Sequence, residues 1–288
     1  MKRRSFARGA LALALCVYAL GGCGTRRGFE PDPESIIPAP QYVAFASTRD
    51  EAHGEIYIMQ ADGSGAHRLT TNAVQDAAPI FSPDGTHLTF RRELNPASVF
   101  VMRTDGTGQV GLAPGTMAAW SPDGAKLALV TDSLCVMNSD ATGRRSLGVG
   151  ATSAAWSPDG TRIAYISSGL AGQQTDEIYL IDPNGAHPLR ITNDGVQKKS
   201  LAWSPDGTLL LYTAGQTLYL IHADGTGLTS PSGGRDGRFS ADGQRIVFVT
   251  DSFDGNEEIY SERLDGSDLR NLTQNAANDT DPDWAPTP

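Results

Sequence analysis

Short apolar runs recur along the chain, and each one follows the same polar turn. The runs are apolar at nearly every position, which is typical of β-strands covered on both faces. They are Leu88–Phe90, Leu127–Val130, Ile163–Ile166, Leu209–Tyr212 and Ile246–Val249. No stretch of helical periodicity interrupts the series, so the pattern predicts an all-β protein.

The turn before each run has one sequence, in which an aromatic residue precedes Ser-Pro-Asp-Gly. Proline presets φ at the first turn position, aspartate suits the second, and glycine accepts the left-handed conformation that follows. The copies are Phe81–Gly85, Trp120–Gly124, Trp156–Gly160 and Trp203–Gly207, with a variant at Phe239–Gly243 and a partial copy at Trp284–Pro286. We therefore expect a strand on each side of every turn.

Each repeat continues with a third strand and a weaker fourth. The third strands, such as Ile56–Met59 and Ile178–Ile181, lead into Asp-Gly or Asn-Gly pairs, which suit tight hairpins. Successive turn aromatics lie 36 to 47 positions apart, and a period near forty is typical of β-propeller blades. The turn tryptophans are expected to wedge between adjacent blades.

The two ends of the repeat region complete each other. Residues 42–70 supply the second, third and fourth strands of a blade, whereas residues 279–284 supply only a first strand. A ring closed by the C-terminal strand entering the N-terminal blade leaves no open edge. The predicted fold is a six-bladed β-propeller of four-stranded antiparallel blades.

The repeat resembles that of the TolB-type, WD40-like β-propellers. The likeness rests on Pro-x-aromatic-Ser-Pro-Asp-Gly, then Ile-Ala-Phe/Tyr-x-Ser, Ile-Tyr, Asp-Gly and Leu-Thr, across residues 41–286. The Gly-His and Trp-Asp pairs of true WD repeats are missing. The resemblance implies the fold and an envelope compartment. TolB itself has an α/β domain ahead of its propeller, where this sequence predicts a signal and a tether, so a role in the Tol system is not implied.

The first forty residues predict export and a lipid anchor. Four basic residues precede an apolar run that is too short to span a bilayer, as in a secretory signal over residues 1–22. The stretch Leu20–Cys23 resembles the lipoprotein box, in which Cys23 is lipidated; the alternative is a chance cysteine after an ordinary signal. Gly24 favours the outer membrane of a Gram-negative cell, with the leaflet left open. Residues 23–40 predict a proline-rich tether, and residues 41–288 the propeller.

The charge of the chain excludes some partners. The formal charge is −10, and removal of the signal, with four basic and no acidic residues, takes it to −14. An acidic domain without a dense Lys/Arg stretch is a poor candidate for binding nucleic acid or anionic lipid. The charge favours a cationic partner, or merely solubility. We expect a monomeric propeller that touches the membrane through its lipid anchor alone.

The irregular loops are expected to share one end of the ring. The first-to-second and third-to-fourth turns are short and alike and lie at one end, so the longer connections gather at the other. Loops displayed by a rigid scaffold commonly carry recognition; the alternative is that these are solvated connectors. The candidate binding rim consists of Arg49, Asp50, Glu51, Arg91, Arg92, Asp176, Glu177, Asp254, Asn256 and Glu257.

A set of charged residues is predicted at the channel mouth on the same end. Asp279, Asp281 and Asp283 occupy alternate positions of an innermost strand, so all three are expected to point to one side. Alignment of the repeats adds Asp76, Lys198, Asp236 and Arg238. One interpretation is a divalent cation such as calcium, held by Asp76, Asp279 and Asp281. The favoured one is an inter-blade network in which Arg235 and Arg238 neutralise the aspartates.

Two functions from different classes remain open. The favoured one is a non-enzymatic lipoprotein without cofactor whose propeller binds another envelope or cell-surface protein through the irregular loops and channel mouth. The alternative is a metal-dependent lyase or hydrolase acting on a polysaccharide or lactone. The sequence contains no Gly-x-Ser-x-Gly, His-Glu-x-x-His or Cys-x-x-Cys motif, so the usual nucleophile, zinc and thiol-redox machineries lack their minimal parts.

Overall fold

The computed structural model describes residues 41–167, 176–253 and 255–286, and Cys23 with the rest of the predicted signal and tether lies outside them. Every regular element in the described part is a β-strand. None of its segments forms a helix that is long and apolar enough to cross a membrane.

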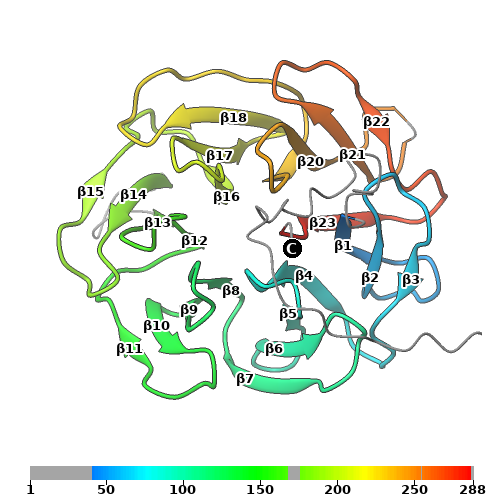
Figure 1. Cartoon of the computed structure of the whole chain (residues 1–288), viewed down its shortest axis with the longest axis horizontal. Coiled ribbons are helices and arrows are strands. Elements are labelled where there is room, and N and C mark those ends of the chain that lie inside the picture. Colours follow the sequence, from blue (N-terminus) through cyan, green and yellow to red (C-terminus); the bar gives the residue numbers. More distant parts are fainter. Residues whose placement is uncertain (1–40, 168–175, 254, 287–288) are drawn as a thin grey trace, which may run out of the picture. The chain divides into compact units, whose positions relative to one another are not determined.

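The strands form six antiparallel sheets, which stand as blades around a central channel (Figure 1). From the innermost strand outward, blades 1 to 3 are β23 (Asp279–Trp284), β1 (Tyr42–Ser47), β2 (Glu55–Gln60) and β3 (His67–Arg68); β4 (Asp76–Phe81), β5 (His87–Arg92), β6 (Ser98–Arg103) and β7 (Val110–Pro114); and β8 (Met117–Trp120), β9 (Lys126–Val130), β10 (Leu134–Asn138) and β11 (Arg145–Ser146). Blades 4 to 6 are β12 (Ser153–Trp156), β13 (Ile163–Ser167), β14 (Glu177–Ile181) and β15 (Leu189–Arg190); β16 (Lys198–Trp203), β17 (Leu209–Ala214) and β18 (Thr217–His222); and β19 (Arg235–Phe239), β20 (Arg245–Thr250), β21 (Glu258–Arg263) and β22 (Arg270–Asn271).

The predicted six-bladed propeller is confirmed, with one local departure in blade 5. Its outer segment follows β18 but pairs with it through isolated bridges, Thr217 with Gly233 and Leu220 with Thr229. Pro231 lies between these bridges and has no N–H to donate, so a regular ladder is interrupted there.

The ring closes as the sequence predicts. β23 pairs with β1, with Val43 opposite Trp284 and Ala46 opposite Thr280. The Ala285 N–H donates to the Tyr42 carbonyl at 2.8 Å, and Trp284 Nε1 donates to Gln41 Oε1 at 3.2 Å. The last strand of the chain therefore supplies the innermost strand of the blade that the first strand begins.

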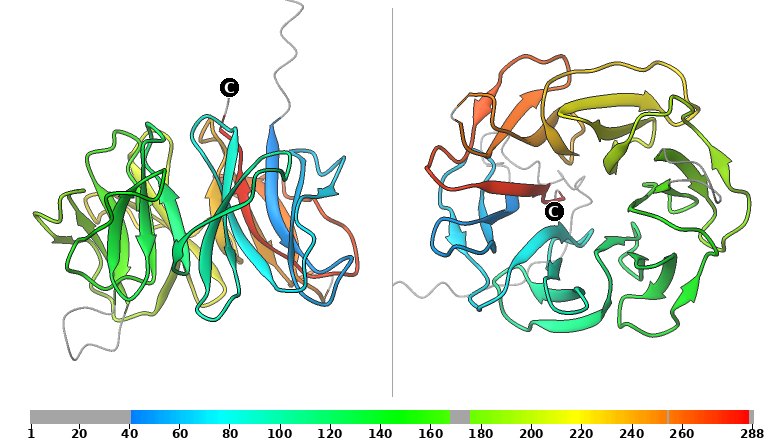
Figure 2. Two further views of the ribbon diagram at one scale, coloured as in Figure 1. Left: turned by 90° about the horizontal axis from the view of Figure 1, so that it is seen from below. Right: turned by 180° about the vertical axis from the view of Figure 1, so that it is seen from behind.

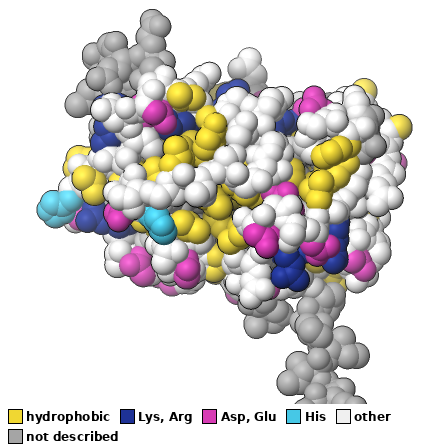
Figure 3. All heavy atoms as spheres, turned by 90° about the horizontal axis from the view of Figure 1, so that it is seen from above, with side chains coloured by type: hydrophobic (Ala, Val, Ile, Leu, Met, Phe, Trp, Pro, Cys, Tyr) yellow, Lys and Arg dark blue, Asp and Glu magenta, His cyan; other side chains and the backbone are white. Residues whose placement is uncertain are grey.

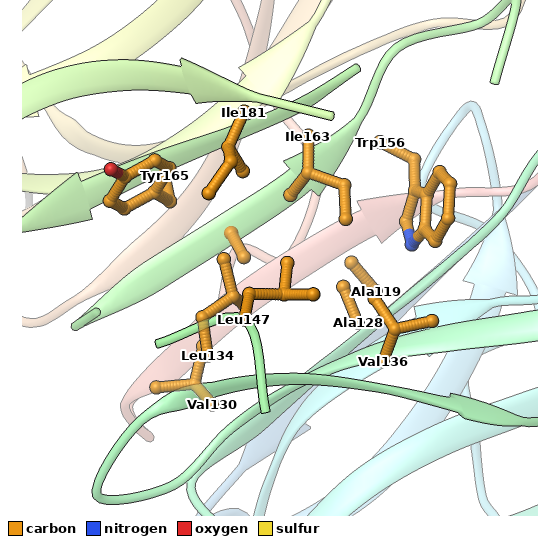
Figure 4. Packing of buried hydrophobic residues seen from close by; sticks show 11 residues of the cluster. Ala119, Ala128, Val130, Leu134, Val136, Leu147, Trp156, Ile163, Tyr165 and Ile181 are labelled. Atoms are coloured by element: carbon orange, nitrogen blue, oxygen red, sulfur yellow. The ribbon is translucent and has the colours of Figure 1, made fainter. Parts of the chain in front are cut away.

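The hydrophobic core lies within and between the blades. The cluster in Figure 4 joins Trp156 of β12 to Ala119, Ala128 and Val136 on three strands of blade 3. Trp203 Nε1 donates to the Ala155 carbonyl of the preceding blade at 3.2 Å. The turn tryptophans thus wedge between blades as predicted, and Cys135 is a buried core residue.

Several innermost strands contain a β-bulge. The register shifts near Ala78, Ser200, Asp236 and Asp281, and these residues have φ values of 50 to 56°. Such left-handed conformations are unusual for residues other than glycine, and a bulge inserts an extra residue that breaks the alternation of side chains. The bulges therefore change where the polar side chains of these strands point.

The two ends of the channel differ in chain connectivity. β1 begins and β23 ends at the face with the Ser-Pro-Asp-Gly turns, which is called the turn face here; the opposite face carries the longer connections and is called the loop face (Figure 2). Seen edge-on, the side of the ring in Figure 3 presents both signs of charge among hydrophobic side chains.

Candidate functional site

Three of the predicted channel-mouth residues begin innermost strands at the loop face, where they are buried. Asp76 accepts from Arg92 Nε at 2.7 Å and Nη2 at 2.8 Å, and from Asn72 Nδ2 at 2.7 Å. Asp279 accepts twice from Arg49 Nη2 at 3.0 Å and from Asn275 Nδ2 at 2.6 Å. Both carboxylates are fully buried, and each accepts three hydrogen bonds.

Lys198 occupies the equivalent position of blade 5, with the charges reversed. Its Nζ contacts Glu177 Oε2 at 3.1 Å, the Val196 carbonyl at 3.0 Å and the Asp194 carboxylate. Asp194 stands where Asn72 and Asn275 stand in the other blades. The cross-strand partner is Ala214 instead of an arginine, so one buried lysine replaces the Asp–Arg pair.

A glutamate at the start of a third strand connects each of these residues to the blade before it. Glu55 accepts from the Thr70 hydroxyl and from the Asn72 N–H at 2.9 Å. Glu177 and Glu258 do the same with Thr192 and Thr273 and with the Gly195 and Asn275 N–H groups. The hydrogen bonds of Thr192, Gly195 and Lys198 lower the pKa of Glu177 although its burial alone would raise it.

These buried networks hold blades together. We name each a blade staple, consisting of the glutamate, the threonine fifteen positions later, the Asn or Asp at seventeen and the Asp or Lys at twenty-one. The spacing is the same in all three copies. The sequence carries this signal, but Glu55 and Glu258 lie outside the Ser-Pro-Asp-Gly turns that mark the repeat most clearly.

The alternative interpretation, a cation held by Asp76, Asp279 and Asp281, does not fit the described residues. Asp76 and Asp279 belong to separate staples, and the bulge at Asp281 breaks the alternation that would place Asp279, Asp281 and Asp283 on one side. Throughout residues 41–167, 176–253 and 255–286, no three acidic, His or Cys side chains are grouped so as to hold a metal ion.

The predicted binding rim divides into two classes. Glu177 is fully buried, Asp176 is buried, and Arg49 and Arg92 are committed to the staples. Asn256 donates to Glu258 and to the Asn275 and Ala277 carbonyls. These members have structural contacts, and Asp176 and Glu177 belong to blade 4, opposite blade 1, so the ten residues do not form one continuous surface. Asp254 lies outside the described residues.

Blades 6, 1 and 2 carry exposed acidic and apolar side chains on the loop face. Glu51 is 48% exposed and Glu93 38% exposed by side chain, and Asp50 is exposed beside Tyr57, whose hydroxyl it accepts. That contact, with burial of the ring, raises the pKa of the Tyr57 hydroxyl. Arg91 pairs with Glu93 at 2.8 Å. Phe253 and Leu94 add exposed apolar surface, at 62% and 43%.

Asp236 and Asp281 mark the channel mouth on this face. They lie at equivalent bulges of β19 and β23, in left-handed conformations with φ values of 56 and 51°. Arg235 pairs with Asp236 at 2.5 Å and also with Glu257. Burial and the nearby Asp236 charge raise the pKa of Asp281, whereas Arg91 and Arg235 counteract the rise. Asp236 and Asp281 are thus close enough for their charges to act on each other, and the charges of Arg91 and Arg235 act on Asp281 in the opposite direction.

Asp283 and Arg238 lie farther along the channel, toward the turn face. Asp283 Oδ2 accepts the Phe81 N–H at 2.8 Å, and Oδ1 is 3.6 Å from Arg238 Nε. This ion pair joins blade 6 to the closing strand, as the network interpretation expects. Burial raises the pKa of Asp283 to about 6, although Arg238 acts in the opposite direction.

The raised pKa of Asp283 predicts a pH-dependent stability. The unfolded chain ionises this carboxyl near its ordinary pKa of 3.8, whereas the folded chain resists ionisation until about pH 6. The contribution to the free energy of unfolding is full below pH 4 and falls by up to about 3 kcal/mol as pH rises through 6. Asp283→Asn keeps an acceptor for Phe81 without the titration. In urea unfolding, the free energy of unfolding of the wild type minus that of the variant should decrease between pH 4 and pH 8. A difference that does not depend on pH would refute the assignment.

The chain has the fold of a six-bladed β-propeller. No protein-family model matches the sequence, and no curated protein matches it. Among solved structures, TolB from Acinetobacter baumannii superposes with a TM-score of 0.75 at 16% identity, covering 85% of this chain and 67% of that one. A protein from Agrobacterium tumefaciens assigned to TolB gives 0.64 at 18% identity, covering 81% and 89%.

An enzyme is also among the similar structures. An oligogalacturonate lyase in complex with manganese superposes with a TM-score of 0.51 at 16% identity, covering 82% of this chain and 74% of that one. Identities this low establish the shared fold alone. The function must therefore be argued from the site.

Proposed function

We propose that the protein is a non-enzymatic envelope lipoprotein whose propeller binds another envelope or cell-surface protein through its loop face and the channel mouth there. The observation that carries the proposal is the pair Asp236 and Asp281. Both are non-glycine residues in left-handed conformations, and the pKa of Asp281 is raised by burial and by its neighbour. Strain and charge repulsion kept together at a channel mouth are typical of functional sites.

The surroundings of this pair suit a basic partner. Asp50, Glu51 and Glu93 are exposed on adjacent blades, and Phe253 and Leu94 offer apolar contacts among them. Complementary charge would steer a cationic surface to the face, and apolar anchors would hold it. The chain enters the propeller at the turn face, where β1 begins. A lipid anchor at Cys23 would therefore be connected to the propeller at the turn face and would leave the loop face free.

The strain at Asp281 gives a test that separates binding from folding. Asp281→Gly removes the carboxylate and relieves a left-handed conformation that glycine adopts at no cost. We expect the variant to unfold at the same temperature as wild type or a few degrees higher, because the substitution removes a side chain that destabilises the fold.

The binding half of the test uses a photo-cross-linking amino acid at Glu51 in growing cells. We expect one cross-linked envelope protein with the wild-type channel mouth and a loss of at least about tenfold in yield with Asp281→Gly. The same amino acid at Thr107, in a third-to-fourth turn of the turn face, is the matched control. An adduct that is unchanged by Asp281→Gly would contradict the proposal.

A further inference from the structure

The turn face holds a chamber that the proposed function does not use. It opens at the turn-face end of the channel, has a volume of about 430 Å³ and receives side chains from all six blades. Each blade contributes the aromatic residue of its turn and the residue two positions later, which is proline in five blades and Ala241 in blade 6. Arg238 and Asp283 are the charged residues among those that line it, and they face each other. The chamber is therefore an apolar bowl with a single ion pair.

A ring of carboxylates stands directly outside the proline ring. It consists of the turn aspartates Asp84, Asp123, Asp159, Asp206 and Asp242, and is called the aspartate crown below. Hydrogen bonds from the turn serines, and from the backbone two residues on, lower the pKa of the first four. Burial acts against this at Asp242, but the same hydrogen bonds lower its pKa as well. All five carry negative charge at neutral pH.

Basic side chains act on the crown only at a distance: Lys126 favours the charged form of Asp123, and Arg245 favours that of Asp242. No member forms an ion pair with any side chain in the described ranges, 41–167, 176–253 and 255–286. The basic residues that follow the turns are engaged elsewhere: Arg162 pairs with Asp182 at 3.0 Å, Arg245 pairs with Asp268 at 2.6 Å, and Lys126 donates to Asn138 at 3.4 Å. The crown therefore offers five negative charges around an apolar bowl.

We propose that the turn face is a second binding site, which takes a basic peptide segment with one apolar side chain. That side chain would enter the chamber against the tryptophan and proline rings, and lysine or arginine residues on either side would meet the crown. Aromatic and proline surfaces make good contacts for apolar anchors, and the surrounding carboxylates select for positive charge. The bowl is shared by all six blades, so it depends on the closed ring and not on the loop face.

The four tryptophans of the chain all line the chamber, so intrinsic fluorescence reports binding directly. The probe is the synthetic peptide acetyl-Lys-Lys-Phe-Lys-Lys-amide, compared with peptides in which glutamate or serine replaces lysine. The full chain should show a saturable fluorescence change with the lysine peptide. The glutamate peptide should bind at least about tenfold more weakly, and added salt should weaken the lysine peptide.

Two sets of variants localise the effect. Changing all five crown residues from Asp to Asn keeps the hydrogen-bond acceptors of the turns and should weaken the lysine peptide at least about tenfold. The matched control makes the same change at Asp62, Asp105, Asp140, Asp224 and Asp265, which cap the outer turns of the same face and also accept the backbone N–H two residues on. It removes equal charge and should leave binding unchanged. Ala155→Phe, which fills the chamber from β12, should also abolish binding.

Several outcomes would overturn the proposal. Equal binding by the crown and outer-turn variants would show that charge at the mouth is irrelevant. Equal binding of the lysine and serine peptides would mean that the bowl accepts any apolar group. A dimer in sedimentation that the crown variant dissolves would make a second copy of this chain the occupant. Asp281→Gly should leave peptide binding unchanged, so failure here and failure of the proposed function are distinguishable.

Discussion

Truncation of the chain after Asn278 should abolish the cooperative unfolding of the whole propeller. The deletion removes β23, which provides the innermost strand of blade 1 and contacts β4 and β19 of its neighbours. It also removes Asp279, leaving Arg49 without its buried partner, and Trp284 from the core. We expect the loss to be comparable with the whole stability of a typical domain, about 5–15 kcal/mol. Thermal unfolding followed by circular dichroism should show no transition.

The control for this experiment is truncation after Pro286, which keeps β23 intact. That variant should unfold at the wild-type temperature. A cooperative transition within a few degrees of wild type after removal of β23 would mean that the remaining blades do not need the closing strand. The ring would then not be the stable unit.

Reversal of the buried charge at Lys198 should destabilise the protein strongly. Lys198→Asp would place a third carboxylate beside Glu177 and Asp194 and remove the cation that contacts both, leaving Glu177 its pair with Arg190 at 3.2 Å. Breaking a buried ion pair usually costs about 3–5 kcal/mol, and we expect at least this loss in urea unfolding. Lys199→Asp is the matched control, because the Lys199 side chain is next to Lys198 in the sequence but is exposed. This substitution should change the free energy of unfolding by less than about 0.5 kcal/mol.

The staple in blade 2 indicates which further substitutions should restore the stability of the Lys198→Asp variant. There Asp76 faces Arg92 across the strands and accepts from Asn72. Adding Ala214→Arg and Asp194→Asn to Lys198→Asp recreates that arrangement in blade 5, because Ala214 is the cross-strand partner of Lys198. The triple variant should recover at least half of the lost stability. Failure to recover any would show that the two staples are not interchangeable.

The fold could be predicted from the sequence because the same turn motif and strand pattern recur from blade to blade. Each Ser-Pro-Asp-Gly turn fixes a reversal, and the incomplete blades at the two ends require each other. The bulges could not be predicted in this way. Asp281 and Asp236 read as ordinary alternating strand residues, and their left-handed conformations follow from packing around the channel.

The candidate site was less predictable, because burial depends on the partners that other strands bring. Glu177 and Arg92 look like surface loop residues in the sequence, yet a threonine or an aspartate from elsewhere in the repeat places each in a staple. The turn aspartates look in the sequence like residues that accept hydrogen bonds within their own turns, and the structure confirms this. That they also encircle an apolar bowl follows from the closed ring.

A disulfide between β1 and β23 tests most directly whether the ring of blades is closed. Ala46→Cys and Thr280→Cys, with the native cysteines changed to alanine, place two thiols at directly paired positions of β1 and β23, within the geometry that a disulfide requires. Oxidation should give an intramolecular disulfide in essentially every molecule, seen by mass spectrometry of proteolytic fragments. The pair Ala44→Cys and Thr280→Cys, which is out of register, should not form one. Failure of the first pair, or disulfides only between molecules, would contradict the closed ring on which both channel mouths depend.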